Sequence, residues 1–461
     1  MASSRKSKPN SFDGLEATVG AALRPLLFPR ARLVLGLSGG LDSVVLFEAL
    51  RRLAGPLDFA LSCVHVNHNI SPNARRWAAF CARLCQRRDI ALALHEVDVA
   101  PYRAEGPEAA ARRARYQVYA RQDKADFIVL AQHQDDHAET LLLQLLRGAG
   151  VKGGAAMPLI REQHAGKKGK AAPAPAVLRP MLALSRKQIE AYARARKLKW
   201  VEDESNADTR YDRNFLRHRV LPVIEQAFPA YRATLARAAR HMAEASLILD
   251  QLAETDARRA LRGNRLLLAE LRDVGEARAK NLLRWLLSRQ GAAAPEADRL
   301  QEALRQLLQA RDDAAVRVAL GEFELRRYAG CAYLLPALPQ PPADLRLEWD
   351  GRRAWALPEL GGALRFARRL GAGLACARVR APGLNLRLRQ GGEKLRLQAR
   401  GSTRSLKNLL QEAQLAPWER ERLPLIYCAD ALVAVPGLGV ASGWEAGAGE
   451  AGWLINWRPQ T

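Results

Sequence analysis

The first third of the chain alternates between short apolar segments and longer segments whose apolar residues recur with helical spacing. The apolar segments have the length of buried strands and cover residues 31–37, 60–66, 90–97 and 126–131. The helical segments cover residues 43–53, 74–88, 107–123 and 136–147. Strands that alternate with helices of this length form βαβ units, so the pattern predicts an α/β fold with a parallel, doubly wound sheet.

The pattern changes after this α/β part. Two stretches rich in Ala, Leu and Arg, at 231–262 and 276–310, have the spacing of amphipathic helices. Prolines crowd residues 336–344, and further on short strands and a helix at 404–415 indicate a small α+β domain. We therefore expect an α/β domain, a helical domain, a connecting segment and an α+β domain, at residues 1–228, 229–335, 336–380 and 381–461.

Composition and charge narrow the class of protein. Six cysteines in 461 residues are too few for a disulfide framework, which favours a reducing cytoplasm. No apolar run is long enough to cross a membrane, and no secretory signal follows the basic N-terminus. Lys and Arg number 72 against 48 Asp and Glu, a net charge of +24. A general enrichment in arginine explains part of this excess, and the rest favours a nucleic-acid partner, because basic surfaces bind phosphates.

A glycine-rich loop, Ser-Gly-Gly-Leu-Asp-Ser at 38–43, lies between the first predicted strand and the first predicted helix. Two glycines permit a tight turn close to an anion, and the N–H groups at the helix start attract phosphates. The loop has no lysine and is therefore not a Walker A loop. A serine-capped glycine turn is the plainer interpretation. However, Asp42 would repel phosphates unless Mg²⁺ lay between them, so the context favours a nucleotide site with Mg²⁺ at Asp42.

Acidic residues follow the predicted strand at 126–131. Asp136 and Glu139 are three residues apart at a helix start, with His133 just before them. Both carboxylates can face one pocket, where they would hold an ammonium group. Acids at a helix N-terminus also occur as simple caps. The neighbouring histidine and the strand end favour the functional interpretation.

Two helical segments carry arginines on one face. Arg112, Arg115 and Tyr116 share a face at the spacing i, i+3, i+4, and Arg213 and Arg217 line one side of a later helix. Each group is either a solvated basic face or a contact for phosphate or tRNA. The second group precedes the change of pattern, where a phosphate clamp between domains would lie.

The loop resembles the PP-loop of the N-type ATP pyrophosphatases, which cleave ATP between the α- and β-phosphates and form AMP-activated intermediates. Nearly the whole chain resembles the tRNA(Ile)-lysidine synthase family. The N-terminal motifs are EAAARRARY at 108–116, HQDDHAET at 133–140, RGAG at 147–150 and WVEDESN at 200–206, followed by RN and R at 213–217. The C-terminal motifs, typical of the longer form of the family, are LRQGGE at 388–393, LKNLLQE at 406–412, PWERERLP at 417–424 and LVAVPGLGV at 432–440. The family usually has two histidines where this chain has Gln132-His133, and often Gln in place of His137.

The resemblance implies a PP-loop domain of the adenine-nucleotide α-hydrolase type, followed by tRNA-binding domains. It implies a cytoplasmic ligase that joins L-lysine to C2 of the wobble cytidine in tRNA(Ile) with a CAU anticodon. ATP is the co-substrate with Mg²⁺, an adenylated cytidine is the intermediate, and AMP and pyrophosphate are released. The product, lysidine, changes codon reading from AUG to AUA and charging from Met to Ile. The family also includes homodimers.

The resemblance also implies roles for single residues. The ATP loop comprises Ser38, Gly39, Gly40, Leu41, Asp42 and Ser43, with Asp42 near Mg²⁺. Asp136 and Glu139 hold the lysine substrate, and Arg112 and His133 lie near the reacting base or the phosphates. The contacts expected for tRNA or phosphate are Arg115, Arg213, Asn214, Arg217, Arg404, Lys407 and Trp418.

Three other functions fit parts of the sequence. A tRNA thiolase shares the loop, but such relatives usually carry paired cysteines in a CxxC motif, and this chain has none. A small-molecule ligase of the same fold would not need a charge of +24 or the extra domains. A non-catalytic tRNA-binding protein would not need Asp42, Asp136 and Glu139. Release of pyrophosphate would distinguish an enzyme from this last class.

Overall fold

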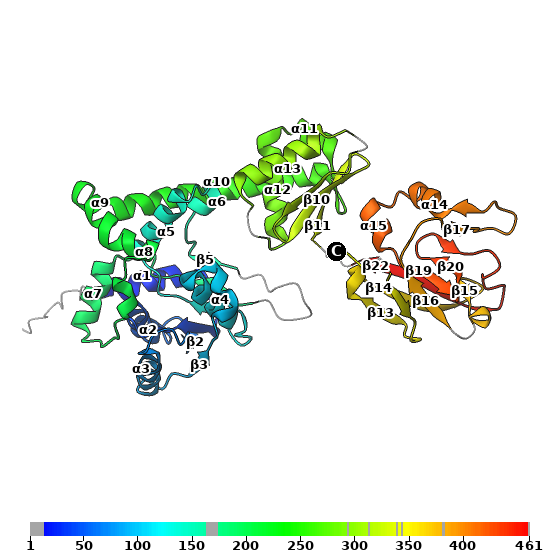
Figure 1. Ribbon diagram of the computed structural model, residues 1–461. Coiled ribbons are helices and arrows are strands. Elements are labelled where there is room, and N and C mark those ends of the chain that lie inside the picture. Colours follow the sequence, from blue (N-terminus) through cyan, green and yellow to red (C-terminus); the bar gives the residue numbers. More distant parts are fainter. Residues whose placement is uncertain are drawn as a thin grey trace, which may run out of the picture. The chain divides into compact units, whose positions relative to one another are not determined.

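The computed structural model describes residues 13–162, 174–292, 295–311, 314–337, 340–342, 344–379 and 383–459 (Figure 1). The chain divides into two compact units, Met1–Leu252 and Ala253–Thr461. No helix in the described ranges is both long and apolar enough to cross a membrane.

The first unit contains a six-stranded sheet with the strand order β3-β2-β1-β4-β6-β5. Its strands are β1 (Ala31–Gly36), β2 (Phe59–Asn67), β3 (Leu92–Glu96), β4 (Phe127–Val129), β5 (Ile160–Arg161) and β6 (Ala176–Leu178). All pairings are parallel except that of β5 with β6. The order reverses between β1 and β4, and in such sheets ligands bind at the carboxyl ends beside this point.

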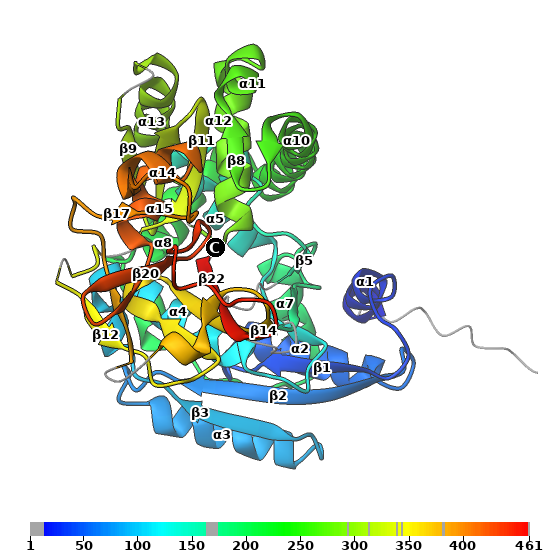
Figure 2. The same cartoon turned by 90° about the vertical axis from the view of Figure 1, so that its right-hand side faces the viewer.

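Helices cover both faces of this sheet, which confirms the doubly wound α/β fold. Alternate residues of β1 point to opposite faces. Leu33 and Leu35 belong to a core that includes residues of α1, α2 and α7, whereas Val34 packs with Val118 and Tyr119 of α4. Figure 2 shows α3 alongside β2 and β3. The longer helices of this unit are α1 (Asp13–Leu23), α2 (Leu41–Leu53), α3 (Ala74–Gln86), α4 (Pro107–Ala120), α5 (Gln134–Leu146) and α7 (Arg186–Ala195).

The other helical segments that precede the long helix of this unit are short. They are η1 (Ala100–Glu105), α6 (Val151–Gly154), η2 (Glu204–Ala207), α8 (Asp212–Phe215), η3 (Leu216–Val220) and α9 (Leu221–Ala227). η3 is one turn of π-helix between α8 and α9. The long helix is α10 (Tyr231–Ala260), and the boundary between the two units falls within it.

The sequence pattern predicts a helical domain in the middle of the chain. The structure instead combines helices with a sheet there. Its helices are α11 (Leu268–Asp273), α12 (Glu276–Arg289) and α13 (Ala297–Gln309). It also contains an antiparallel sheet of β7 (Leu261–Arg262), β8 (Arg265–Leu267), β11 (Cys331–Pro336), β10 (Phe323–Tyr328) and β9 (Arg317–Leu320). These strands are short and rich in Arg and Leu, as the neighbouring helices are, so no distinct strand pattern marks them in the sequence. Gly291, with φ of +76°, lies in the turn after α12 and separates α12 from α13 within the helical stretch expected at 276–310.

The segment expected to connect domains at 336–380 instead contributes strands to the C-terminal sheets, so that expectation is corrected. β14 (Gly362–Leu370) pairs along its whole length with β22 (Ala451–Pro459). The other strands of this segment are β12 (Arg346–Glu348), β13 (Ala354–Leu357) and β15 (Leu374–Ala375), with the short helices η4 (Pro358–Leu360) and η5 (Cys376–Arg378). Prolines and glycines between these short strands obscured them in the sequence.

The remaining C-terminal elements complete two antiparallel sheets and a two-stranded ribbon. The sheet orders are β12-β16-β19-β20-β21 and β13-β14-β22-β15, and β17 pairs with β18. The elements are β16 (Leu384–Arg387), β17 (Lys394–Leu395), β18 (Arg404–Ser405), α14 (Leu406–Glu412), α15 (Pro417–Arg422), β19 (Leu425–Cys428), β20 (Ala431–Val435) and β21 (Gly439–Val440). Leu364 and Phe366 of β14 share a core with Leu384 and Leu386 of β16.

Candidate functional site

The glycine loop turns directly from the carboxyl end of β1 into α2. Gly39 has φ of +88°, and a Cβ there would lie 3.1 Å from Cys81 Sγ and from Val201 Cγ2, so only glycine fits without displacement. Ser43 Oγ accepts a hydrogen bond from the Gly39 N–H (3.1 Å) and donates to the Gly40 carbonyl (2.9 Å). Ser38 Oγ lies 3.0 Å from Ser43 Oγ. These bonds fix the loop in a closed turn.

The loop leaves the start of α2 open to an anion. Gly40 is the N-cap residue and has no side chain to satisfy the first N–H groups of the helix. Leu41 is buried beneath it and anchors the helix start. The Val201 N–H donates to the Gly39 carbonyl (3.0 Å), so the WVEDESN segment supports the loop from outside. The free N–H groups suit a phosphate.

Asp42 on the first turn of α2 contacts a cation that the sequence analysis missed. Arg186 Nη1, at the start of α7, lies 2.8 and 2.7 Å from the two carboxylate oxygens of Asp42. His133 Nε2 lies 3.6 Å from Asp42 Oδ1. Burial alone would raise the pKa of Asp42, but His133 and Arg186 outweigh burial and lower it. Arg186 is the first residue of α7, the helix that follows β6. Its position after a strand of the sheet is the feature of the sequence that could have identified it as a site residue.

His133 is surrounded by carboxylates just beyond β4. Its side chain is almost fully buried, and Nε2 lies 3.5 Å from Asp136 Oδ2 while Nδ1 lies 3.8 Å from Asp135 Oδ2. Asp136 also accepts the backbone N–H of His133 (3.1 Å) and so caps α5. Burial lowers the pKa of His133, but Asp136, Asp42 and Asp135 together raise it above its ordinary value. The structure thus brings Asp42, His133 and Asp136 into one cluster beside the loop.

Glu139 is not open to a ligand in this structure, in contrast to the expected shared pocket with Asp136. Its side chain is 1% exposed and both oxygens are bonded. Arg213 Nε lies 3.0 Å from Oε2, and Arg217 donates from Nε to Oε1 (2.7 Å) and from Nη2 to Oε2 (2.8 Å). The helical spacing predicted that Glu139 lies near Asp136, but it did not reveal that Arg213 and Arg217 bond to its oxygens. Glu139 therefore holds Arg213 and Arg217 in place.

These two arginines do not form a solvated face. Arg213 also donates to Thr140 Oγ1 (2.7 Å), and Arg217 Nη2 lies 3.5 Å from Asp136 Oδ1. Burial would lower the pKa of Arg217, but Glu139 and Asp136 raise it. Asn214, between them, is buried and donates to the Asp208 carbonyl (3.0 Å). Its side chain thus secures the turn before α8, so the structure does not support the expected contact with tRNA.

The arginines of α4 contact different groups. The Arg112 guanidinium lies over the Tyr116 ring, 4.9 Å from its centre. Arg115 Nε lies 3.4 Å from His68 Nε2. Burial, together with the Arg115 charge, lowers the pKa of His68 to about 4, so this histidine is neutral. Arg112 and Arg115 share a helix but have separate surroundings.

The C-terminal candidates lie in the second unit. Arg404 forms an exposed ion pair with Glu412, and Lys407 is exposed at the start of α14. Trp418 is corrected from a tRNA contact to a core residue, because it is 9% exposed and packs edge-on against Tyr333, with ring centres 5.0 Å apart. An apolar ring in such a core cannot also stack on a base.

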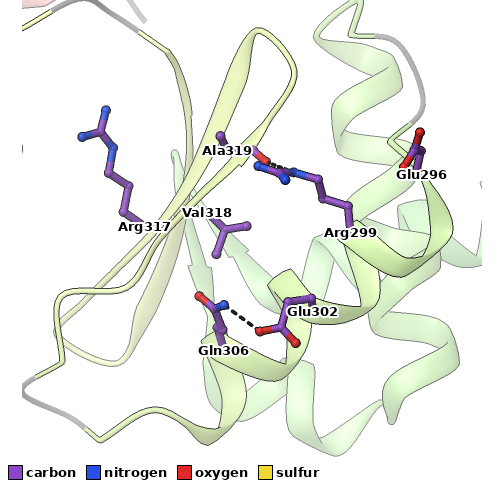
Figure 3. A pocket seen from close by; sticks show the side chains of 7 residues that line it. All are labelled: Glu296, Arg299, Glu302, Gln306, Arg317, Val318 and Ala319. Atoms are coloured by element: carbon purple, nitrogen blue, oxygen red, sulfur yellow. Dashed lines mark hydrogen bonds between the residues drawn. The ribbon is translucent and has the colours of Figure 1, made fainter.

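A hollow of about 450 Å³ lies between α13 and β9 in the second unit (Figure 3). It is lined by Glu296, Arg299, Glu302, Gln306, Arg317, Val318 and Ala319. Arg299 Nε donates to the Ala319 carbonyl (2.7 Å), and Gln306 donates to Glu302 (2.7 Å). Polar groups here bond to one another, and none of the predicted site residues lines the hollow. The candidate site is therefore the carboxyl edge of β1 and β4.

Family models match all three parts of the chain. A model described as a PP-loop domain matches residues 14–224. Models described as the TilS substrate binding domain and the TilS substrate C-terminal domain match residues 266–333 and 384–457. A solved TilS C-terminal domain is 27% identical to this chain, covering 25% of it and 98% of its own length, with a TM-score of 0.22.

Two curated relatives match almost end to end. The tRNA(Ile)-lysidine synthase of Nitrosomonas europaea is 44% identical over 439 residues, which are 95% of this chain and 94% of that protein. The tRNA(Ile)-lysidine synthase of Chromobacterium violaceum is 44% identical over 92% of this chain and 94% of its own length. Both relatives therefore resemble this chain over nearly the full length of each protein. The chain belongs to the tRNA(Ile)-lysidine synthase family.

Proposed function

We propose that this chain joins L-lysine to C2 of the wobble cytidine in tRNA(Ile) with a CAU anticodon, using ATP and releasing AMP and pyrophosphate. The observation that carries the proposal is the position of Asp136 and His133 beside the glycine loop and Asp42, in a chain related over 95% of its length to a tRNA(Ile)-lysidine synthase. An anion site and a carboxylate for an amine are what ATP and lysine need.

The loop suits ATP with Mg²⁺. Its N–H groups at the start of α2 would bind phosphate oxygens, and the ionised Asp42 carboxylate would hold Mg²⁺ jointly with them. In the described residues no cluster of three or more acidic, histidine or cysteine ligands could hold a metal. Mg²⁺ commonly binds through one or two carboxylates plus substrate phosphates, so this donor set fits. The ion would neutralise charge that develops on the phosphates.

The chemistry proceeds in two displacements. The C2 carbonyl oxygen of cytidine attacks the α-phosphorus of ATP, and pyrophosphate leaves. The lysine ε-amine then attacks C2, a carbon–nitrogen bond forms, and AMP leaves with the former carbonyl oxygen. Activation is needed because a carbonyl oxygen leaves poorly and AMP leaves well. We assign Asp136 to hold the lysine ammonium group and to receive its proton as the amine attacks.

The arginines around the cluster supply positive charge. Arg112 and His133, whose pKa the surrounding carboxylates raise, are assigned to the phosphates or the reacting base. Arg213 and Arg217, held by Glu139, are assigned to phosphate oxygens of ATP or tRNA. Preorganised cations of this kind stabilise the charge of the transition state without reorganisation.

The test is incorporation of radiolabelled L-lysine into tRNA(Ile) with a CAU anticodon, in the presence of ATP and Mg²⁺. The elongator methionine tRNA, which shares this anticodon, is the control. Label in the isoleucine tRNA alone is the expected result. Pyrophosphate release without label would reject lysine as the nucleophile, and neither product from a folded, ATP-binding chain would reject the enzyme.

Asp136→Asn is expected to raise the KM for lysine by at least about tenfold, because a charged partner of an ammonium group contributes about 1.5–3 kcal/mol. The KM for ATP should change less than about twofold, since Asp136 does not contact the loop. Initial rates at varied lysine and fixed ATP would measure this. An unchanged lysine KM would contradict the assignment.

Ending the chain after residue 337 is expected to raise the KM for tRNA by roughly tenfold or more, because basic contacts to the nucleic acid are lost. The KM for ATP should stay near that of the full chain. The cut must precede β12, because a cut at 381 would remove β22 and leave β14 without its partner. Equal increases in both constants would show that this part of the chain is structural.

A further inference from the structure

Arg179 is a buried cation without an acidic partner among the described residues. It follows β6 at the carboxyl edge of the sheet and is 2% exposed. Its Nη1 donates to the Pro158 carbonyl (2.8 Å), and its Nε donates to the Gln132 amide oxygen. Burial lowers the pKa of Arg179, and the charges of Arg161 and Arg112 act in the same direction, with only Tyr116 opposing them. Burying an unpaired charge is costly, so the arrangement calls for an anion.

Two more guanidinium groups lie beside it. Arg112 of α4 and Arg161 of β5 lie over the ring of Tyr116, 4.9 and 4.7 Å from its centre. Both arginines are exposed, and throughout the described ranges no ion pair involves either of them or Arg179. Three cations therefore surround one tyrosine, and none of the three has an ion-pair partner among the described residues.

The two departures from the family pattern lie in this same place. Gln132 accepts the bond from Arg179 with an amide, which orients the guanidinium without neutralising it. His137 is 7% exposed, and its Nε2 has no hydrogen-bond partner in the described part of the chain. Burial and the Arg179 charge lower the pKa of His137. A neutral imidazole here has an N–H or lone pair available for a ligand and adds no charge of its own.

We propose that Arg161 and Arg112 bind one backbone phosphate of the tRNA strand that carries the reacting cytidine, and that the buried charge of Arg179 beside them strengthens this attraction. The inference rests on the proposed function. The glycine loop at β1 is assigned to the phosphates of ATP, so a second anion site at β6 serves a different ligand. A lysine carboxylate needs one cation, whereas two exposed arginines with a third, buried arginine beside them suit a polynucleotide backbone.

The test measures tRNA binding without chemistry, by fluorescence anisotropy in the absence of ATP and lysine, over a range of salt concentrations. Arg161→Gln is expected to raise the Kd for tRNA about three- to tenfold and to reduce the slope of log K against log salt by about 0.7–0.9. Arg87→Gln is the control, because Arg87 is an exposed arginine at the end of α3, outside this cluster. The control should bind as the unaltered chain does.

A second variant keeps Arg179 and cancels its charge. Gln132→Glu places a carboxylate against the guanidinium, so the variant should be at least as stable as the unaltered chain and yet bind tRNA about three- to tenfold more weakly. Unchanged Kd and salt slope in both variants would overturn the proposal. An increased KM for lysine with normal tRNA binding would also overturn it and assign the site to the lysine carboxylate. If the unaltered chain binds tRNA but forms no lysidine, the proposed function fails while the phosphate site stands.

Discussion

Asp42→Ala is expected to lower lysidine formation at least about a thousandfold. Loss of one preorganised electrostatic group typically lowers a rate by about two to three orders of magnitude, and this variant also loses the carboxylate assigned to Mg²⁺. The fold should survive, because Asp42 is a partly exposed residue on the first turn of α2 whose partner Arg186 keeps its bond to Glu190. Single-turnover incorporation of labelled lysine measures the rate, and circular dichroism checks the fold.

Glu190→Gln is the matched control for Asp42. It removes a second carboxylate that contacts the Arg186 guanidinium and leaves the loop unchanged, so it should retain most of the activity. If Asp42→Ala turned over at the normal rate in a folded protein, the loop would not be the ATP site. If both variants lost activity equally, the effect would come from Arg186 and not from Mg²⁺.

Glu139→Gln is expected to destabilise the first unit by about 3 kcal/mol, because removing one member of a buried ion cluster leaves the other charges uncompensated. The new amide N–H₂ would face donors of Arg213 or Arg217, which both bond to this carboxylate. Chemical denaturation with a probe of the first unit measures the change, and the midpoint should fall.

The comparison with Asp136→Asn separates stability from substrate binding. Asp136 is at the cluster surface, so its variant should unfold near the normal midpoint while the lysine KM rises. Glu139→Gln should instead lower kcat and weaken all substrates together, because Arg213 and Arg217 lose their anchor. A Glu139→Gln variant with normal stability and only a raised lysine KM would restore the role that the sequence pattern suggested.

Much of the catalytic fold could be predicted from periodicity. The buried strand ending at Gly36 and the helix beginning at Leu41 followed from the apolar run, the two glycines and the helical spacing. The cluster at His133 and Asp136 followed from acids placed directly after a strand. These features are local, so a short window of sequence contains all the information that determines them.

The contacts that could not be predicted depend on partners far away in the chain. Glu139 meets Arg213 and Arg217 from more than 70 positions later, and Asp42 meets Arg186 after 144. Arginine is common throughout this sequence, so no single arginine stands out as the partner. In the segment 336–380, β12 and β15 likewise pair with strands that lie further along the chain, β16 and β22, in addition to being separated by prolines and glycines.

The pairing of β14 with β22 has a consequence for synthesis of the protein. A ribosome that has completed β14 must translate β15 to β21 before the partner strand leaves the exit tunnel. During this interval β14 has an unpaired edge, which is a template for aggregation. A nascent chain that is terminated early in this interval is therefore released with that edge open, and β22 decides whether the sheet that contains β14 is completed.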